Sequence, residues 1–139
     1  MCKDGTVKLI DFGAARFTVE TEEERTRSII LKPGFSPAEQ YQSKGKQGPW
    51  TDIYALGATM YRAITGVLPE ESTDRVVNDE LKEPIYYAPQ MPQYLNNILM
   101  KCMAVQPELR FQTVESLEAA LYRKRKVTST KKELFRRKL

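Results

Sequence analysis

Asp11 is the residue whose type and position in the sequence most suggest a chemical role. It follows an apolar run at residues 7–10 and is followed at once by Phe12 and Gly13. A carboxylate at the end of a strand can bind a hard divalent cation such as Mg²⁺, which favours one or two carboxylates together with phosphate oxygens. Gly13 lets the backbone turn sharply, and Phe12 can fill an apolar pocket that fixes the turn. The same residues also fit an aspartate that does no more than begin a turn.

Composition excludes several other kinds of catalytic site. The chain contains no histidine, so neither a Ser-His-Asp nor a Cys-His arrangement can form within it. Its two cysteines, Cys2 and Cys102, lie far apart and form no CxxC pair. This usage argues against a disulfide scaffold or a structural zinc site, and it fits a reducing cytosol.

The elements that must position Asp11 follow from local patterns. We expect short strands at 7–10 and 14–17, a polar surface loop at 18–28, and a helix of one or two turns near residues 36–37. The clearest helix spans 51–65 and ends at Gly66, a typical left-handed terminator. A second helix covers about 95–103, and a third begins at Thr113, a typical N-cap. The sequence therefore predicts a mainly α fold with a small N-terminal β element.

Apolar spacing predicts which helix faces are buried. In helix 51–65 the residues that recur at helical spacing are Ile53, Leu56, Met60 and Ile64. A helix that is apolar nearly all round belongs in the centre of a domain. In the third helix the expected buried stripe consists of Val114, Leu117 and Leu121.

Four motifs occur in a fixed order along the chain. They are Asp-Phe-Gly at 11–13, Gly-Phe-Ser-Pro-Ala-Glu-Gln-Tyr at 34–41, Thr-Asp-Ile-Tyr-Ala-Leu-Gly at 51–57 and Pro-Glu-Leu-Arg-Phe at 107–111. Residues 3–122 thereby resemble the C-terminal half of a eukaryotic-type Ser/Thr protein kinase domain, most of all its bacterial branch. The resemblance implies a kinase-like C-lobe fragment with short strands and the Asp-Phe-Gly motif at 1–17, the activation segment and P+1 region at 14–42, the helical lobe at 43–122 and a basic tail at 123–139.

The resemblance assigns the nucleotide side of the site to the first motif. Asp11 would hold Mg²⁺ on the phosphates of ATP beside Phe12 and Gly13, so ATP and Mg²⁺ are the cofactors expected of an intact parent kinase. Thr26 and Ser28 lie in the implied activation loop, flanked by arginines. They are the best candidates for regulatory phosphorylation, which would order the loop. A simple solvated loop is the alternative.

The resemblance assigns the protein-substrate side to later residues. Those that match the P+1 segment, which cradles the substrate beside its acceptor hydroxyl, are Gly34, Phe35, Ser36 and Pro37. Glu39 and Arg110 match a carboxylate and a guanidinium that the family joins in a structural ion pair. Asp52 matches an aspartate that accepts hydrogen bonds from the backbone of the catalytic loop. An ordinary first-turn aspartate, favoured by the helix dipole, fits that position equally well.

The chain also departs from the family pattern. A kinase's Gly-rich loop, strand lysine, αC glutamate and catalytic loop all precede Asp-Phe-Gly, whereas this chain begins ten residues before Asp11. We therefore expect the chain alone to be inactive, and its parent to transfer phosphoryl groups from ATP to Ser or Thr of proteins. A pseudokinase-like or regulatory protein-binding half-domain is the alternative. Lys32 stands where most members have Thr, which leaves the Ser/Thr specificity and full activity open.

Charge and exposure predict further partners. The chain carries a net charge of +4, and residues 123–139 hold nine Lys or Arg and one Glu, so the tail contributes +8 and residues 1–122 contribute −4. The tail is either a solvated extension or a ligand for an anionic membrane surface, and nucleic acid is not expected. We expect self-association through exposed lobe surface or through exchange of residues 14–42. No signal peptide or membrane span is expected, so we expect a cytoplasmic chain, with a membrane-anchored parent left open.

Overall fold

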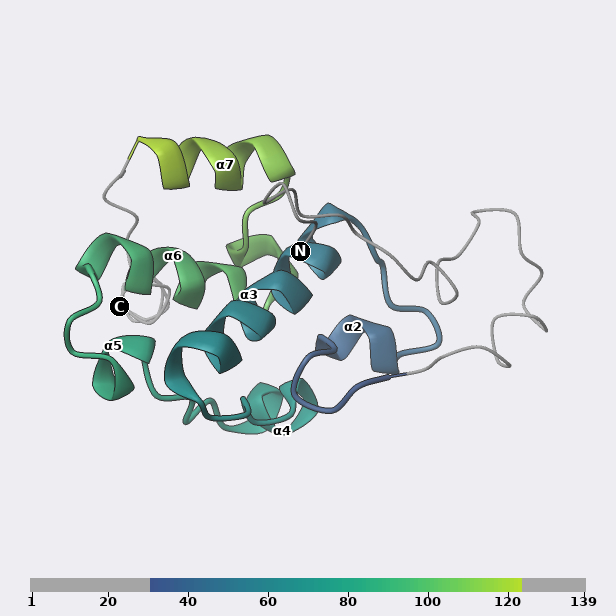
Figure 1. Ribbon diagram of the computed structural model, residues 1–139. Helices are drawn as coiled ribbons and strands as arrows, with labels where there is room; N and C mark the ends of the chain where they lie inside the picture. Colours follow the sequence, from purple (N-terminus) through teal and green to yellow (C-terminus); the bar gives the residue numbers. More distant parts are fainter. Residues whose placement is uncertain (1–30, 124–139) are drawn as a thin grey trace, which may run out of the picture. The chain divides into compact units, whose positions relative to one another are not determined.

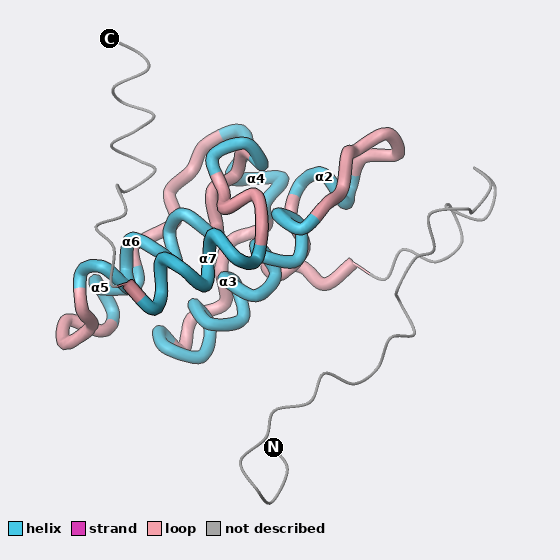
Figure 2. The backbone as a smooth tube through the Cα atoms, turned by 90° about the horizontal axis from the view of Figure 1, so that it is seen from above, coloured by secondary structure: helices cyan, strands magenta, loops and turns pink. Residues whose placement is uncertain are grey.

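The computed structural model describes residues 31–123, which lie in the second of two units of the chain, the one that begins at Leu31. The helices follow the order α2 (Ala38–Tyr41), α3 (Pro49–Thr65), α4 (Ser72–Val77), α5 (Pro84–Tyr87), α6 (Gln93–Cys102), the 3₁₀ helix η1 (Pro107–Leu109) and α7 (Val114–Tyr122). No strand occurs among residues 31–123 (Figure 2). The described part is therefore helical as predicted, while the strands predicted at 7–17 lie outside it.

The longest helix, α3, runs through the middle of the others, with α7 on one side and α4 on the other (Figure 1). It begins two residues earlier than predicted, at Pro49, because proline is well tolerated in the first turn of a helix. The backbone N–H of Gly48 donates to the Thr51 hydroxyl at 3.2 Å. Gly66 ends the helix with φ of 72° and donates to the carbonyl of Arg62, so the predicted left-handed cap is confirmed.

Two hydrophobic clusters meet along α3. Ile53 joins a cluster with Ile98, Cys102, Phe111, Leu117 and Ala120. Tyr54, Ala58 and Tyr61 join a second cluster with Leu81, Met100 and Met103. Gly57 lies at the crossing of α3 and α6, where a Cβ atom would come within 2.7 Å of the Cys102 Cβ. The absence of a side chain at Gly57 therefore allows the two helices to approach closely.

The predicted buried stripe of α3 is wrong in part. Leu56 is 49% exposed and Ile64 is 37% exposed, whereas Tyr54 and Tyr61 are almost fully buried. Tyr54, Ala58 and Tyr61 pack with Met100 of α6. Of the four residues in the predicted stripe, only Ile53 is buried in the core. In α7, likewise, Val114 and Leu121 are exposed, and the buried positions are Leu117 and Ala120. The Thr113 cap is confirmed, since its hydroxyl accepts from the Ser116 N–H at 3.2 Å.

Cys102 makes the stability of the chain sensitive to alkaline pH. Burial raises the pKa of its thiol from 9.0 to about 12. The folded state therefore keeps the thiol neutral where the unfolded chain ionises it, so this contribution to stability is complete below about pH 9 and is lost between about pH 9 and 12. Urea denaturation at rising pH should show the free energy of unfolding falling over this window. The free energy of unfolding of the Cys102→Ala variant should fall less steeply with pH. An unchanged slope would contradict the assignment of this pH dependence to the Cys102 thiol.

Candidate functional site

The segment predicted to contact substrate forms a closed turn. The N–H groups of Phe35 and Ser36 both donate to the carbonyl of Lys32 at 3.0 Å. The N–H of Lys32 donates in return to the Ser36 hydroxyl at 3.1 Å. The side chain of Lys32 is exposed, and Pro37 is buried at the start of α2. The backbone of residues 32–37 is thus fixed by its own hydrogen bonds.

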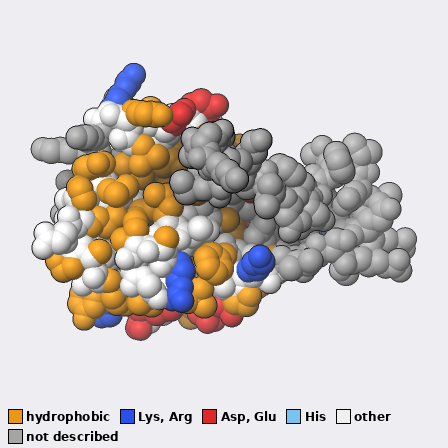
Figure 3. Space-filling view, in the orientation of Figure 1, with side chains coloured by type: hydrophobic (Ala, Val, Ile, Leu, Met, Phe, Trp, Pro, Cys, Tyr) orange, Lys and Arg blue, Asp and Glu red, His pale blue; other side chains and the backbone are white. Residues whose placement is uncertain are grey.

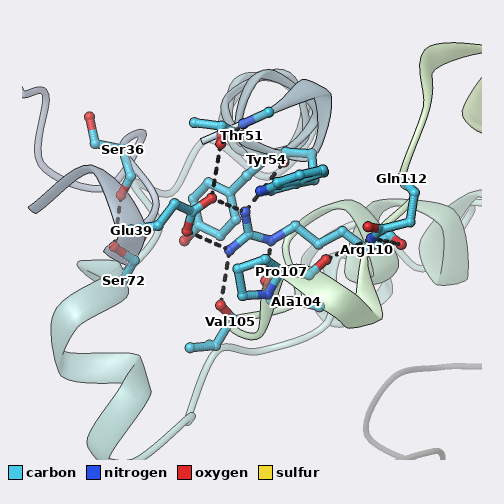
Figure 4. A network of polar contacts seen from close by, with 12 residues as sticks. Ser36, Glu39, Thr51, Tyr54, Ser72, Ala104, Val105, Pro107, Arg110 and Gln112 are labelled. Carbon is cyan, nitrogen blue, oxygen red and sulfur yellow. Dashed lines mark hydrogen bonds and ion pairs between the residues drawn. The ribbon is translucent and has the colours of Figure 1, made fainter. Parts of the chain in front are cut away.

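This turn is also attached to the helical lobe. The hydroxyl of Ser72, the first residue of α4, donates to the carbonyl of Ser36 at 2.8 Å, and the bond is buried (Figure 4). Phe35 packs against the cluster that contains Tyr54 and Tyr61. The segment of residues 34–37 therefore rests on α4 and on the core, and it is continuous with α2.

Gly34 is required by both its conformation and its surroundings. Its φ is 79°, and a Cβ there would lie 2.7 Å from the carbonyl oxygen of Pro69. We expect Gly34→Ala to lower the free energy of unfolding by about 1–3 kcal/mol, because left-handed backbone strain and a clash act together. Gly66 is a matched control, since its φ is 72° but no atom lies within 4 Å of its Cβ position. Urea denaturation should show a larger loss for Gly34→Ala, and equal losses would contradict the clash.

The structure brings together Glu39 and Arg110, which the sequence separates by 71 positions. Arg110 Nη1 lies 2.6 Å from Glu39 Oε1, and Nη2 lies 3.1 Å from Oε2 (Figure 4). Glu39 is 6% exposed and Arg110 is 2% exposed. The Thr51 hydroxyl donates to Glu39 Oε1 at 3.1 Å. The pair is bidentate and desolvated, a geometry that makes charge-assisted hydrogen bonds strong and specific.

Arg110 uses all five of its N–H donors. Besides the two bonds to Glu39, Nε donates to the carbonyl of Ala104 at 2.7 Å, Nη1 to that of Trp50 at 3.3 Å and Nη2 to that of Val105 at 2.9 Å. Its guanidinium also lies 4.8 Å from the centre of the Tyr54 ring. The pair thus ties α2 to the start of α3 and to the loop after α6.

Sequence reasoning missed a second buried arginine, Arg75 in α4. Its Nε and Nη2 donate to the Asp79 carboxylate at 2.9 and 3.1 Å, and its remaining bonds reach the Tyr54 hydroxyl and the Met103 carbonyl, both at 3.0 Å. Burial disfavours its charge, but the bonds to Asp79 and Tyr54 outweigh burial and raise its pKa. An Arg-Asp pair four residues apart was visible in the sequence, but that spacing is typical of exposed helix faces.

Tyr54 connects the two arginines. Its hydroxyl accepts from Arg75 while its ring faces Arg110. The side chain is fully buried, and burial raises its pKa although both arginines act in the opposite direction. Glu39 and α4 are therefore joined through one aromatic side chain in addition to the Ser36–Ser72 bond.

The other residues that the sequence predicted to have a role are Asp52 and five residues outside the described range. Asp52 lies exposed in the first turn of α3. Asp11, Phe12, Gly13, Thr26 and Ser28 lie outside the described residues. Within residues 31–123 no group of three or more potential ligands gathers to hold a metal ion. Among the helices of residues 31–123, none combines the length and hydrophobicity that a membrane span requires.

Comparisons with known proteins agree with this arrangement. The family model for the protein kinase domain matches residues 1–122. The chain is 37% identical over 124 residues to the tyrosine-protein kinase MasK of Myxococcus xanthus, which covers 84% of this chain and 19% of that protein. It is 30% identical to the serine/threonine-protein kinase PrkC of Bacillus subtilis, over 83% of this chain and 18% of that protein.

A solved structure supports the same assignment. The apo form of PpkA-294 superposes with a TM-score of 0.61 and 37% sequence identity, covering 71% of this chain and 34% of that one. The chain spans about a fifth of the length of the two curated relatives. The family model covers most of the chain and the helical fold matches that of PpkA-294, so the chain belongs to the protein kinase domain family, of which it represents a part.

Proposed function

We propose that this chain is the substrate-binding part of a Ser/Thr protein kinase, and that its intact parent transfers the γ-phosphoryl group of ATP to protein serine or threonine. The observation that carries the proposal is the buried Glu39–Arg110 pair, which holds α2 directly after the turn of residues 32–37. A substrate backbone laid against a fixed turn keeps its acceptor hydroxyl in one place, and such positioning accounts for much of the catalysis of phosphoryl transfer.

The nucleotide side of the proposed site depends on residues outside the described range. Asp11, with Phe12 and Gly13, would bind Mg²⁺, which neutralises charge on the phosphates of ATP. We expect no transfer by the 139-residue chain alone, because the family places the general base and the rest of the nucleotide site before Asp-Phe-Gly. A regulatory half-domain would use the same turn to bind a protein without phosphorylating it.

The test uses the intact parent with Mg²⁺ and labelled ATP. Wild-type parent should label a protein acceptor, and Asp11→Asn should lower the rate by about a hundredfold or more, since charge stabilisation at the phosphates is a large part of the rate enhancement. Glu118→Gln, at an exposed position of α7, should leave the rate unchanged. Phosphoamino acid analysis should find phosphoserine or phosphothreonine. Phosphotyrosine alone would refute the Ser/Thr assignment, and no transfer at all would favour the regulatory alternative.

We also propose that the chain self-associates through apolar surface or through exchange of residues 14–42. Leu56 and Ile64 are exposed along α3, and a broad area of hydrophobic side chains covers the face on which α3 lies (Figure 3). Apolar patches of this kind tend to mark interfaces. Light scattering should show dimers or larger species, and Leu56→Ser with Ile64→Ser should shift them towards monomers unless exchange is the cause.

Three further proposals concern regions outside the described residues. Phosphorylation of Thr26 or Ser28 would regulate the parent by ordering its activation loop. The basic tail at 123–139 would contact an anionic membrane surface. The kinase domain would act in the cytoplasm, either free or in a membrane-anchored parent. Phosphopeptide mapping, and sedimentation of the chain with anionic and neutral vesicles, test the first two.

A further inference from the structure

We propose that the outward face of α4 is a docking surface for a basic, apolar-containing segment of a protein substrate, separate from the residues around the acceptor hydroxyl. This deepens the proposed function, on which it rests for the identity of the partner as a substrate. Three features of the molecule support it, namely the way α4 is held, the side chains it exposes and the charges around them.

The helix is firmly held although it has only six residues. At its start Ser72 is bonded to the carbonyl of Ser36, and one turn later Arg75 is bonded to Asp79, Tyr54 and Met103. Ser72 is 1% exposed and Arg75 is 2% exposed. Both buried residues lie on one face, so the other face of α4 is presented to solvent in a fixed position.

The exposed surface of α4 includes two valines: Val77 lies opposite the buried residues, with Asp74 near it, and Val76 lies beside the buried face. Val77 is 89% exposed and Val76 is 58% exposed. The described residues leave Val77 almost uncovered and Val76 partly covered, so an apolar partner would remove exposed hydrophobic surface from water. Since a helix rises about 1.5 Å per residue, Val77 lies about 8 Å along the axis from Ser72, which touches the predicted P+1 segment. A bound polypeptide could therefore contact both regions.

The surroundings of the valines are acidic. Residues 70–83 contain six carboxylates and only two basic residues. The two basic residues are already engaged, because Arg75 is paired with Asp79 and Lys82 lies over the Tyr86 ring at 4.9 Å. Glu70 and Asp74 are exposed, and Asp74 is one helical turn from Val77. Hydrophobic and acidic side chains lie together at the lower edge of the molecule, where α4 is found (Figure 3).

Charge complementarity indicates which kind of partner this surface of α4 would bind. An acidic rim steers basic partners towards it and rejects acidic ones, while the valines require an apolar side chain from the partner. A segment in which Arg or Lys alternates with leucine-like residues satisfies both requirements. A second copy of α4 would bring like charges together and fits less well.

Binding to the complete 139-residue chain tests the proposal without ATP. The probe is a fluorescein-labelled peptide that alternates arginine with leucine, measured by anisotropy at low salt. Val77→Ser should raise its Kd about tenfold. Asp74→Asn should raise it about two- to fivefold, and this difference should disappear at high salt. Val114→Ser is the control, because it makes the same substitution at an exposed valine of another helix, α7, and it should leave the Kd unchanged.

Two altered peptides separate the apolar contribution to binding from the electrostatic one. A peptide with serine in place of leucine should bind about tenfold more weakly, and one with glutamate in place of arginine should not bind. Equal binding of the glutamate peptide, or a Kd unaffected by Val77→Ser, would overturn the proposal. A Kd unaffected by Val77→Ser is also expected if residues 123–139 of the same chain, or a second copy of the chain, occupied this face of α4. Because the readout is binding, a parent that fails to transfer phosphate while the chain binds the peptide would refute the proposed function and leave the docking surface standing.

Discussion

Arg110→Met should lower the free energy of unfolding of the chain by about 3–5 kcal/mol, the usual cost of removing one partner of a buried ion pair. The substitution leaves the Glu39 carboxylate 6% exposed without its guanidinium. It also removes the donors that the carbonyls of Ala104, Val105 and Trp50 now use. Urea denaturation followed by circular dichroism measures the change.

A double substitution separates the ion pair from the rest of the loss. Glu39→Met combined with Arg110→Met removes the orphaned charge, so the double variant should be less destabilised than the sum of the two single variants by at least about 1 kcal/mol. Arg123→Met, at an exposed arginine after α7, should change stability by no more than about 0.5 kcal/mol. A loss below about 1 kcal/mol for Arg110→Met would show that the pair does not hold the fold.

Arg75→Met is expected to have the second largest effect, a loss of at least about 2 kcal/mol. The Tyr54 hydroxyl and the Met103 carbonyl would lose their donor in a buried site, which costs about 1–3 kcal/mol for each unsatisfied group. The Asp79 side chain is 30% exposed, so water would compensate for part of its lost partner. The expected loss is therefore smaller than that of Arg110→Met. The same denaturation experiment measures it.

The role of Tyr54 in this network can be isolated. Tyr54→Phe removes only the hydroxyl and should cost about 1 kcal/mol in the wild-type background. In the Arg75→Met background the same substitution should cost close to nothing, because the hydroxyl has already lost its donor. Additive losses in this double-mutant cycle would contradict a direct Arg75–Tyr54 bond. Weaker peptide binding by Arg75→Met at a temperature where it remains folded would show that the network also positions α4.

Local chemistry made part of the fold predictable. The end of α3 at Gly66 and the start of α7 after Thr113 follow from backbone preferences that act within a few residues. The pairing of Glu39 with Arg110 was inferred from the order of four motifs. No local rule could have produced it, because 71 positions separate the two residues.

Other features depend on tertiary packing and could not be predicted from the sequence. In α3, Leu56 and Ile64 have helical spacing, and so do Tyr54 and Tyr61; only contact with α6 decides which of these two pairs is buried. The helices α4 and α5 have six and four residues, too few for periodicity to reveal. The burial of Arg75 depends on Tyr54 and Met103, which come from different elements. The Asp11 and phosphorylation assignments stay predictions.

The central claim is that these helices form a substrate platform whose nucleotide site requires residues beyond those of this chain. The most direct measurement incubates the 139-residue chain with Mg²⁺, labelled ATP and an acceptor peptide that carries serine beside the arginine-leucine repeat, in parallel with the intact parent. We expect the chain to bind the peptide without labelling it, and the parent to label its serine. Labelling by the chain alone that Asp11→Asn abolishes would contradict the claim.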